Sequence, residues 1–108
     1  MTTPFVSQLR ARPSTIRLSR EGAASITIRV EMPEVWDVVR IVCAPNENAL
    51  TIKLRALEAL FPEAAMHQDF VLKLRGWEIL DEAAPLAEVG VVDGSILLLT
   101  HRRRRPVR

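Results

Sequence analysis

Hydrophobic and polar residues alternate strictly along the stretch "SITIRVEM". The apolar side of this stretch holds Ile26, Ile28, Val30 and Met32. A period of two predicts a β-strand with one buried face, and Pro33 ends it. The stretch "VVRIVCA", residues 38–44, repeats the alternation after a short connection, so the two stretches together predict an antiparallel hairpin.

The period becomes helical in the stretch "NALTIKLRALEALFP". Apolar residues recur there at i, i+4, i+7 and i+11, and they are Leu50, Leu54, Leu57 and Phe61. Asn48 is suited to cap the helix and Pro62 prevents its continuation, so we expect one amphipathic helix of about three turns. Its Leu54 and Leu57 are predicted to be buried against the strands.

The rest of the chain returns to strand patterns. "DFVLKLRG" alternates up to Gly76, which is expected to turn the chain into a short strand around residues 78–80. "APLAEVG" predicts a single helical turn that Gly90 stops. The last apolar run, "SILLLT", is continuous, which indicates a central strand of the sheet. Leu72 and Leu97 from these strands are expected to pack against the helix.

Charge is distributed unevenly along the 108 residues, whose formal net charge is +2. Residues 1–24 carry +3, residues 25–100 carry −6 and residues 101–108 carry +5. The first segment is rich in Ser, Thr, Pro and Arg and poor in apolar residues, so we expect it to be disordered and outside the fold. We therefore predict one acidic domain between a basic N-terminal segment and a basic C-terminal tail.

The hydrophobic content, 48%, is not concentrated in any membrane-spanning or secretory stretch. No run approaches the roughly 20 apolar residues that cross a bilayer, and the N-terminus lacks the apolar core of a signal peptide, so a cytoplasmic location is expected. Cys43 is the only cysteine and lies in an apolar strand pattern. We predict a buried side chain there rather than a reactive thiol.

The predicted order of elements is strand, strand, helix, strand, short strand, helical turn and strand. The stretches "APNENALTIKLRAL" and "LKLRGWEILDEAAPLAEVGVVDGSILLL" resemble corresponding parts of the ubiquitin-like β-grasp proteins. The more specific pattern is Pro-Leu-x-Glu-x-Gly-Val-x-Asp-Gly-Ser, from Pro85 to Ser95. The chain looks most like the bacterial YukD-type proteins, small accessory proteins of type VII secretion whose domain is also fused to membrane components of that apparatus.

This resemblance implies a fold class, a function and partners. The fold would be α+β, with a mixed four- to five-stranded sheet wrapped on one helix over residues 25–100. The function would be that of a non-catalytic protein–protein interaction module, with components of a secretion apparatus as its partners.

The sequence differs from ubiquitin at the positions on which conjugation and receptor recognition of ubiquitin depend. Conjugated relatives end in Gly-Gly, whereas here no glycine follows Gly94. Lys73, Leu98 and Thr100 occupy the places of ubiquitin's apolar recognition patch, so we expect them to bind a partner other than ubiquitin receptors. The alternative is a modifier of a bacterial conjugation pathway with a processed or non-Gly-Gly C-terminus, whose partners would be ubiquitin-like activating and conjugating enzymes.

Trp77 and the C-terminal arginines are the other candidate binding residues. Trp77 follows a turn where a core side chain is not expected, and exposed tryptophan is enriched in interface hot spots. The alternative is an indole that folds over the sheet edge or packs near Trp36. The tail contains Arg102, Arg103, Arg104, Arg105 and Arg108. We expect it to be solvated or to dock on a protein partner, with weak contact to nucleic acid or an anionic membrane as the alternatives.

Catalysis and metal binding have little support in the sequence. His67 and His101 have no further ligand residues at metal-binding spacing. Asp81 and Glu82 are adjacent carboxylates in a loop, which is typical of solvated charge rather than of an acid–base pair. We therefore expect no enzymatic activity, no metal and no cofactor.

Overall fold

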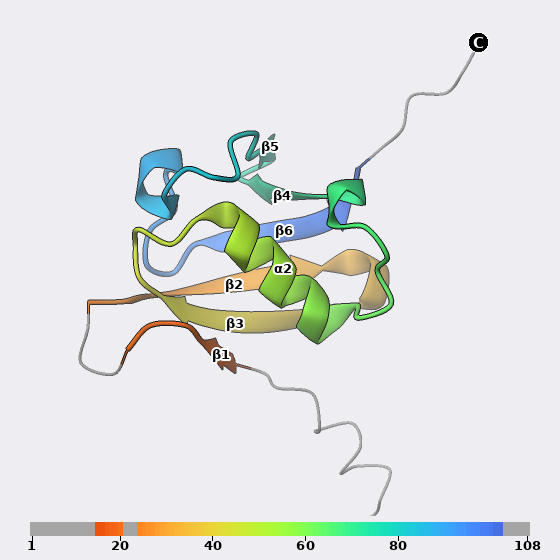
Figure 1. Cartoon of the computed structure of the whole chain (residues 1–108), viewed down its shortest axis with the longest axis horizontal. Coiled ribbons are helices and arrows are strands. Elements are labelled where there is room, and N and C mark those ends of the chain that lie inside the picture. The colour runs from red at the N-terminus through yellow and green to blue at the C-terminus, as the bar shows by residue number, and fades with distance from the viewer. Residues whose placement is uncertain (1–14, 21–23, 103–108) are drawn as a thin grey trace, which may run out of the picture.

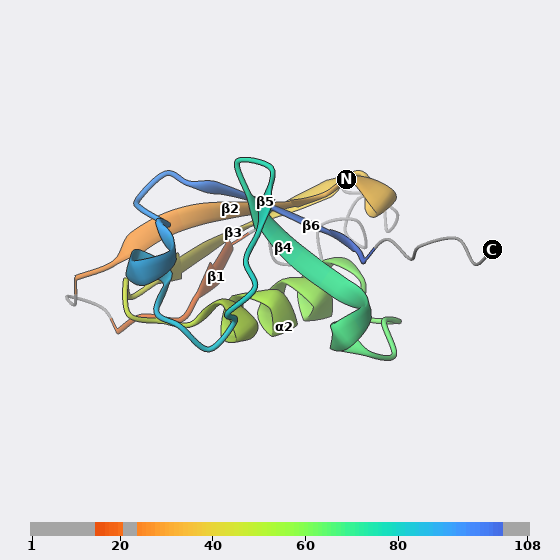
Figure 2. The same cartoon turned by 90° about the horizontal axis from the view of Figure 1, so that it is seen from above.

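The computed structural model describes residues 15–20 and 24–102, which form one sheet with an α-helix across one face (Figure 1). The strands are β1 (Thr15–Arg17), β2 (Ile26–Met32), β3 (Asp37–Cys43), β4 (Phe70–Leu74), β5 (Trp77–Glu78) and β6 (Ile96–His101), the helix is α2 (Ala49–Leu60), and short 3-10 helices span Pro33–Val35, His67–Asp69 and Leu86–Val89. The sheet order is β1-β3-β2-β6-β4-β5. Figure 2 shows α2 on one side of the sheet and no α-helix of the described residues on the other.

The centre of the sheet agrees with the sequence patterns. Strands β2 and β3 form the expected antiparallel hairpin, in register from Ile26 opposite Cys43 to Met32 opposite Asp37. Strand β6 is central, parallel to β2 and antiparallel to β4. The sheet is therefore mixed, and alternate residues of its strands point into one core with the helix.

The sheet has six strands rather than the four or five that the resemblance implied. The additional strand is β1, which pairs in parallel with β3 and places Ile16 opposite Ile41. Ile16 and Leu18 pack against the core. Part of the N-terminal segment that we expected outside the fold therefore contributes an edge strand, while residues 1–14 and 21–23 lie outside the described residues. Because β1 pairs in parallel with a distant strand, no hairpin turn connects the two strands, and the sequence contains no turn motif from which the pairing could be predicted.

Helix α2 begins as expected, because the Asn48 side chain accepts a hydrogen bond from the Thr51 N–H at 2.8 Å. Leu57 is buried, together with Leu72 and Leu97 of the strands. Leu54 is 43% exposed, so the prediction of a buried Leu54 is wrong.

The buried stripe of α2 passes through a lysine, which explains this error. The stripe consists of Ala49, Ile52, Lys53, Ala56, Leu57, Ala59 and Leu60. Lys53 is 1% exposed and its Nζ donates to both carboxylate oxygens of Glu82, at 2.8 and 2.9 Å, and to the Phe70 carbonyl at 3.1 Å. Because Lys53 occupies an inward position, the apolar residue that follows it lies at the margin of the stripe.

Positive backbone φ angles occur at two of the turns that the sequence predicts. Arg75 and Gly76 connect β4 to β5 with φ of 53° and 85°, and a two-residue hairpin loop of type I′ requires positive φ at both positions. The short strand is Trp77–Glu78, slightly earlier than expected. Gly90 ends the predicted helical turn in a left-handed conformation with φ of 94°.

Candidate protein-binding surface

One end of the sheet gathers exposed apolar side chains from three segments. Strand β4 is antiparallel to β6, and its last residue, Leu74, lies opposite Leu97, so the β4–β5 turn lies beside the start of β6. We define the apolar edge by its exposed members, which are Trp77, Leu80, Val92 and Ile96. Trp77 and Leu80 are 79% and 82% exposed. Exposed apolar residues that gather at one place are typical of interaction sites.

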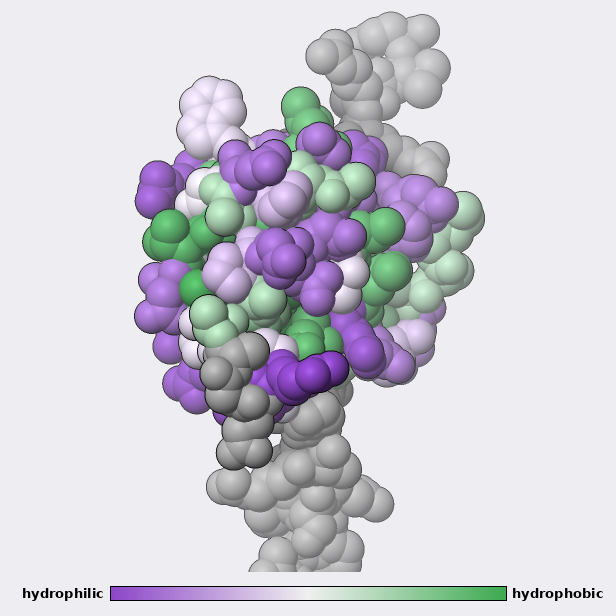
Figure 3. Space-filling model, turned by 60° about the vertical axis from the view of Figure 1, so that its left-hand side comes forward, coloured by the Kyte–Doolittle hydropathy of each residue, from purple (hydrophilic) through white to green (hydrophobic). Residues whose placement is uncertain are grey.

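Two shallow grooves make the apolar edge continuous. One is lined by Leu74, Arg75, Trp77, Glu78, Ile79, Leu80, Val89 and Gly90. The second runs from Leu74 and Arg75 to Ile96 and also includes Val92. Because they share Leu74 and Arg75, the grooves adjoin. Figure 3, which views the side that lies on the left in Figure 1, shows apolar side chains among hydrophilic ones over the surface.

Trp77 is exposed because of its position in the hairpin. It lies opposite Leu74 in β5, the edge strand, immediately after the turn. Trp36 is 94% exposed and adjoins the β2–β3 turn, where Met32 lies opposite Asp37 at the other end of the sheet. The two indoles therefore do not pack together. The alternative interpretation, in which the Trp77 indole packs over the sheet edge or near Trp36, is therefore wrong. The role of Trp77 in binding stays a prediction.

Lys73, Leu98 and Thr100 lie on the sheet face that is turned away from α2. Lys73 is opposite Leu98, and Thr100 is two residues further along β6 on the same face. All three are partly buried. The Thr100 hydroxyl donates to Glu34 Oε2 at 2.6 Å, so this polar group is engaged within the fold. The three residues share one face of the sheet, and their role in binding a partner stays a prediction.

Glu34 also accepts a hydrogen bond from the His101 N–H at 2.9 Å. Partial burial would by itself raise the pKa of this carboxyl group. The hydrogen bonds from Thr100 and His101 outweigh burial, so the pKa of Glu34 is lowered from its ordinary value of 4.5. The hydrogen bonds between Glu34 and the end of β6 are therefore strongest when the Glu34 carboxylate is charged.

Arg102 is bound to the domain rather than free in a tail. Its N–H donates to the Asp69 carbonyl at 2.6 Å, its Nε to the Gln68 carbonyl at 3.2 Å, and its guanidinium pairs with Glu78 at 3.1 Å. The expectation that the basic tail leaves the sheet as a solvated segment from Arg102 onward is therefore wrong for Arg102. The other tail candidates, Arg103, Arg104, Arg105 and Arg108, lie outside the described residues.

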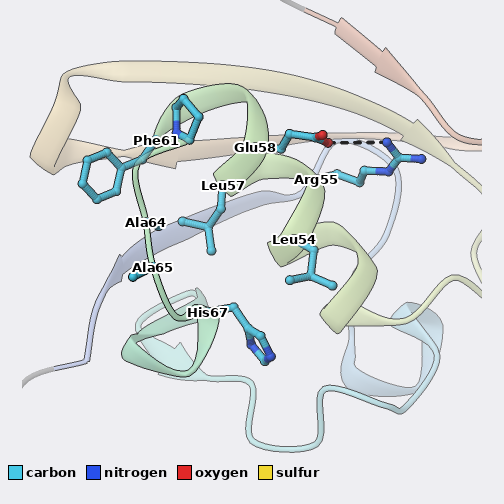
Figure 4. Close-up of a pocket in the computed structure, with 9 residues that line it drawn as sticks. Leu54, Arg55, Leu57, Glu58, Phe61, Ala64, Ala65 and His67 are labelled. Atoms are coloured by element: carbon cyan, nitrogen blue, oxygen red, sulfur yellow. Dashed lines mark ion pairs between the residues drawn. The ribbon is translucent and has the colours of Figure 1, made fainter.

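A third groove lies along α2, where the sequence predicted a buried Leu54. Leu54, Leu57, Phe61 and His67 line it from the helix and from the loop that follows, with the Arg55–Glu58 ion pair of 3.5 Å at its rim (Figure 4). The His67 Nδ1 is buried without a hydrogen-bond partner among the described residues. The partly exposed Leu54 is one of the side chains that line this groove.

The chemistry of the described residues is limited. No group of three or more His, Cys, Asp or Glu side chains within them is placed to hold a metal ion. Burial, with a smaller effect of the Glu47 charge, raises the pKa of the buried Cys43 thiol to about 11, which disfavours the reactive thiolate. Of the helices in the described ranges, none is long and apolar enough to cross a membrane.

Comparison with known proteins identifies the fold. No protein-family model and no curated protein matches the chain. Among solved structures, the ubiquitin-like domain of an Arabidopsis thaliana protein matches with a TM-score of 0.62 and 17% identity, covering 83% of this chain and 90% of that domain. Caldiarchaeum subterraneum ubiquitin also has a TM-score of 0.62 and 17% identity, covering 75% of this chain and 98% of the other.

A protein designed on the basis of ubiquitin gives a similar result, with a TM-score of 0.61, 17% identity, and coverage of 81% of this chain and 100% of the design. These proteins share the mixed sheet and the single helix with this chain, at identities that speak for the fold alone. The chain has the α+β fold of the ubiquitin-like β-grasp proteins.

Proposed function

We propose that this chain is a non-catalytic protein–protein interaction module, and that it serves as a YukD-like accessory protein of type VII secretion. The apolar edge carries the proposal of an interaction module. Its Trp77 is 79% exposed at the end of an edge strand, where the fold gains little from burying it. Tryptophan that is solvent-exposed in the free protein is a frequent anchor of protein interfaces.

The surroundings of Trp77 support a binding role. Leu80 stands beside it in the same groove and is 82% exposed, and the groove continues to Ile96 through Leu74. An apolar centre with a charged rim, here Arg75 and Glu78, has the composition of a protein interface. The assignment to type VII secretion rests on the resemblance of the sequence pattern from Pro85 to Ser95.

The experiment compares Trp77→Ala with Trp36→Ala, because both residues are exposed tryptophans at opposite ends of the sheet. Each variant is expressed in the native host with an affinity tag, and co-purified proteins are quantified. Trp77→Ala should weaken partner binding by about 2 kcal/mol or more with an almost unchanged melting temperature, whereas Trp36→Ala should leave binding intact. Equal recovery of the partner with both variants would contradict the proposed surface.

The identity of the co-purified protein tests the rest of the proposal. A component of a type VII secretion apparatus is the expected partner. The alternative of a protein modifier stays a prediction, and it expects an adenylating or conjugating enzyme instead, together with a covalent adduct in the intact mass of the protein recovered from its host. Recovery of only the unlinked chain from a host with active conjugating enzymes would exclude the modifier.

A further inference from the structure

Charge divides the domain into two sides. The sheet face turned away from α2 carries Arg17, Arg29, Arg40 and Lys73 against Glu31 and Glu78, as the strand registers place them, and Glu34 adjoins this face through its hydrogen bond with Thr100. Glu78 is already paired with Arg102 at 3.1 Å. Helix α2 carries Glu58, and the adjoining segments carry Glu47, Glu63, Asp81, Glu82 and Glu88, with Leu50 N donating to the Glu82 carbonyl and Leu86 N to the Glu47 carbonyl. Six of the twelve acidic residues of residues 25–100 therefore lie on the helix side, whereas cations outnumber carboxylates on the outer sheet face.

Two arginines of this face stand directly opposite each other. Arg29 of β2 and Arg40 of β3 are cross-strand partners, a position in which Cβ atoms are about 5 Å apart. The described residues give neither side chain an ion pair or a hydrogen bond. Like charges at such positions destabilise a sheet, so the two charges do not favour the fold.

The arginine pair borders a small depression in the face. The depression has a volume of about 170 Å³ and is lined by Thr27, Ile28, Arg29, Arg40, Gly94 and Ile96. The start of β6 is held against β2 there, because Gly94 N donates to the Thr27 carbonyl at 2.8 Å and Arg29 N donates to the Ser95 carbonyl at 3.0 Å. Ile96 is half exposed and also belongs to the apolar edge. The two arginines thus adjoin the apolar edge at Ile96.

We propose that Arg29 and Arg40 bind the carboxylates of an acidic segment of the partner protein, whose apolar side chains contact the apolar edge. This inference rests on the proposed function and names the chemistry of its partner. Guanidinium groups bind carboxylates through paired hydrogen bonds, and an acidic residue placed between the two arginines removes their mutual repulsion.

The surroundings favour an acidic polypeptide over a nucleic acid. Phosphate backbones are bound by many cations along a track, whereas here Glu31 follows Arg29 on the same face and Ile96 and Leu98 occupy the neighbouring strand. Apolar side chains beside a short row of arginines match a segment in which acidic residues are interspersed with apolar ones. Charge complementarity thus selects a protein partner.

The test is a titration of the full-length, ¹⁵N-labelled chain with a short blocked peptide rich in glutamate and leucine, followed by NMR. We expect chemical-shift changes at Arg29, Arg40 and Ile96, and none with the corresponding glutamine and leucine peptide. Arg29→Gln combined with Arg40→Gln should weaken binding by at least about tenfold. Arg55→Gln, which removes the same charge from the helix side, should bind as the parent does and is the matched control.

Other outcomes would overturn the inference. These are no shift changes, changes outside this surface, an unchanged affinity of the double variant, or equal weakening by Arg55→Gln. Tighter binding of inorganic phosphate or single-stranded DNA at the same arginines would make this a phosphate site instead. The single Arg29→Gln and Arg40→Gln variants provide the same measurement if the double variant does not fold. A positive Trp77 experiment alongside a negative titration would leave the proposed function standing and remove only the acidic partner.

Discussion

The basic side chains under α2 and on the outer sheet face differ in whether they have ionic partners within the fold. Under α2, Lys53 is buried and all of its contacts are within the fold, with the Glu82 carboxylate and the Phe70 carbonyl. On the outer sheet face, Arg29 and Arg40 stand opposite each other and contact no carboxylate of the described residues. The first charge is part of the core, whereas the second pair is exposed and has no ion pair among the described residues. The difference separates a charge that the fold uses from two charges that are available to a partner.

Removing the partner of the buried lysine should have the largest effect on stability. Glu82→Ala leaves the Lys53 ammonium buried with only the Phe70 carbonyl as acceptor, so the free energy of unfolding should fall by about 3–5 kcal/mol. Chemical denaturation of the variant and the parent measures this difference. Lys53→Met is the matched control, because it removes the buried charge and keeps the volume, and it should cost clearly less. A loss below about 1 kcal/mol for Glu82→Ala would place Lys53 outside the core.

Two leucines of α2 sharpen the contrast between buried and exposed sides. Leu57→Ala should lower the free energy of unfolding by about 2–5 kcal/mol because it leaves a cavity between helix and sheet. Leu54→Ala removes the same atoms from a side chain that is 43% exposed, so its effect should be below about 1 kcal/mol. Thermal and denaturant unfolding of both variants test this. Equal losses would show that the two positions share the same burial.

Glu34 contributes a smaller, pH-dependent stabilisation at the end of the outer face. Its lowered pKa means that the folded state favours the charged form, so this contribution is present above about pH 4.5 and is lost as the pH falls through the folded-state pKa. Glu34→Gln keeps an acceptor for Thr100 and His101 and removes the charge. The difference in melting temperature between parent and Glu34→Gln should therefore shrink below pH 4.5. A constant difference down to about pH 2 would mean that the charge has no part in it.

The sequence predicted the centre of the fold better than its margins. Alternation and helical periodicity located β2, β3, α2, β4 and β6 because each pattern is local. Strand β1 was not predicted because its three residues pair with a distant strand. The burial of Lys53 was not predicted because a charged residue in a helix is expected to be exposed unless its ionic partner is known. The turn before Trp77 was readable from Gly76, so its exposure was anticipated as one of two possibilities. The cross-strand position of Arg29 and Arg40 depends on register, which alternation alone does not fix.

Removing one of the outer-face arginines should produce the smallest change in stability of these variants. Arg40→Thr replaces a repulsive cross-strand neighbour of Arg29 with a residue that favours strands, so the free energy of unfolding should stay within about 0.5 kcal/mol of the parent or rise. Arg55→Thr is the control, because Arg55 is ion-paired with Glu58 on the helix and threonine is a weaker helix former. If Arg40→Thr instead cost more than about 1 kcal/mol, the arginine would serve the fold as Lys53 does. The contrast between the two sides of the domain would then fail, because both would use their charges for structure.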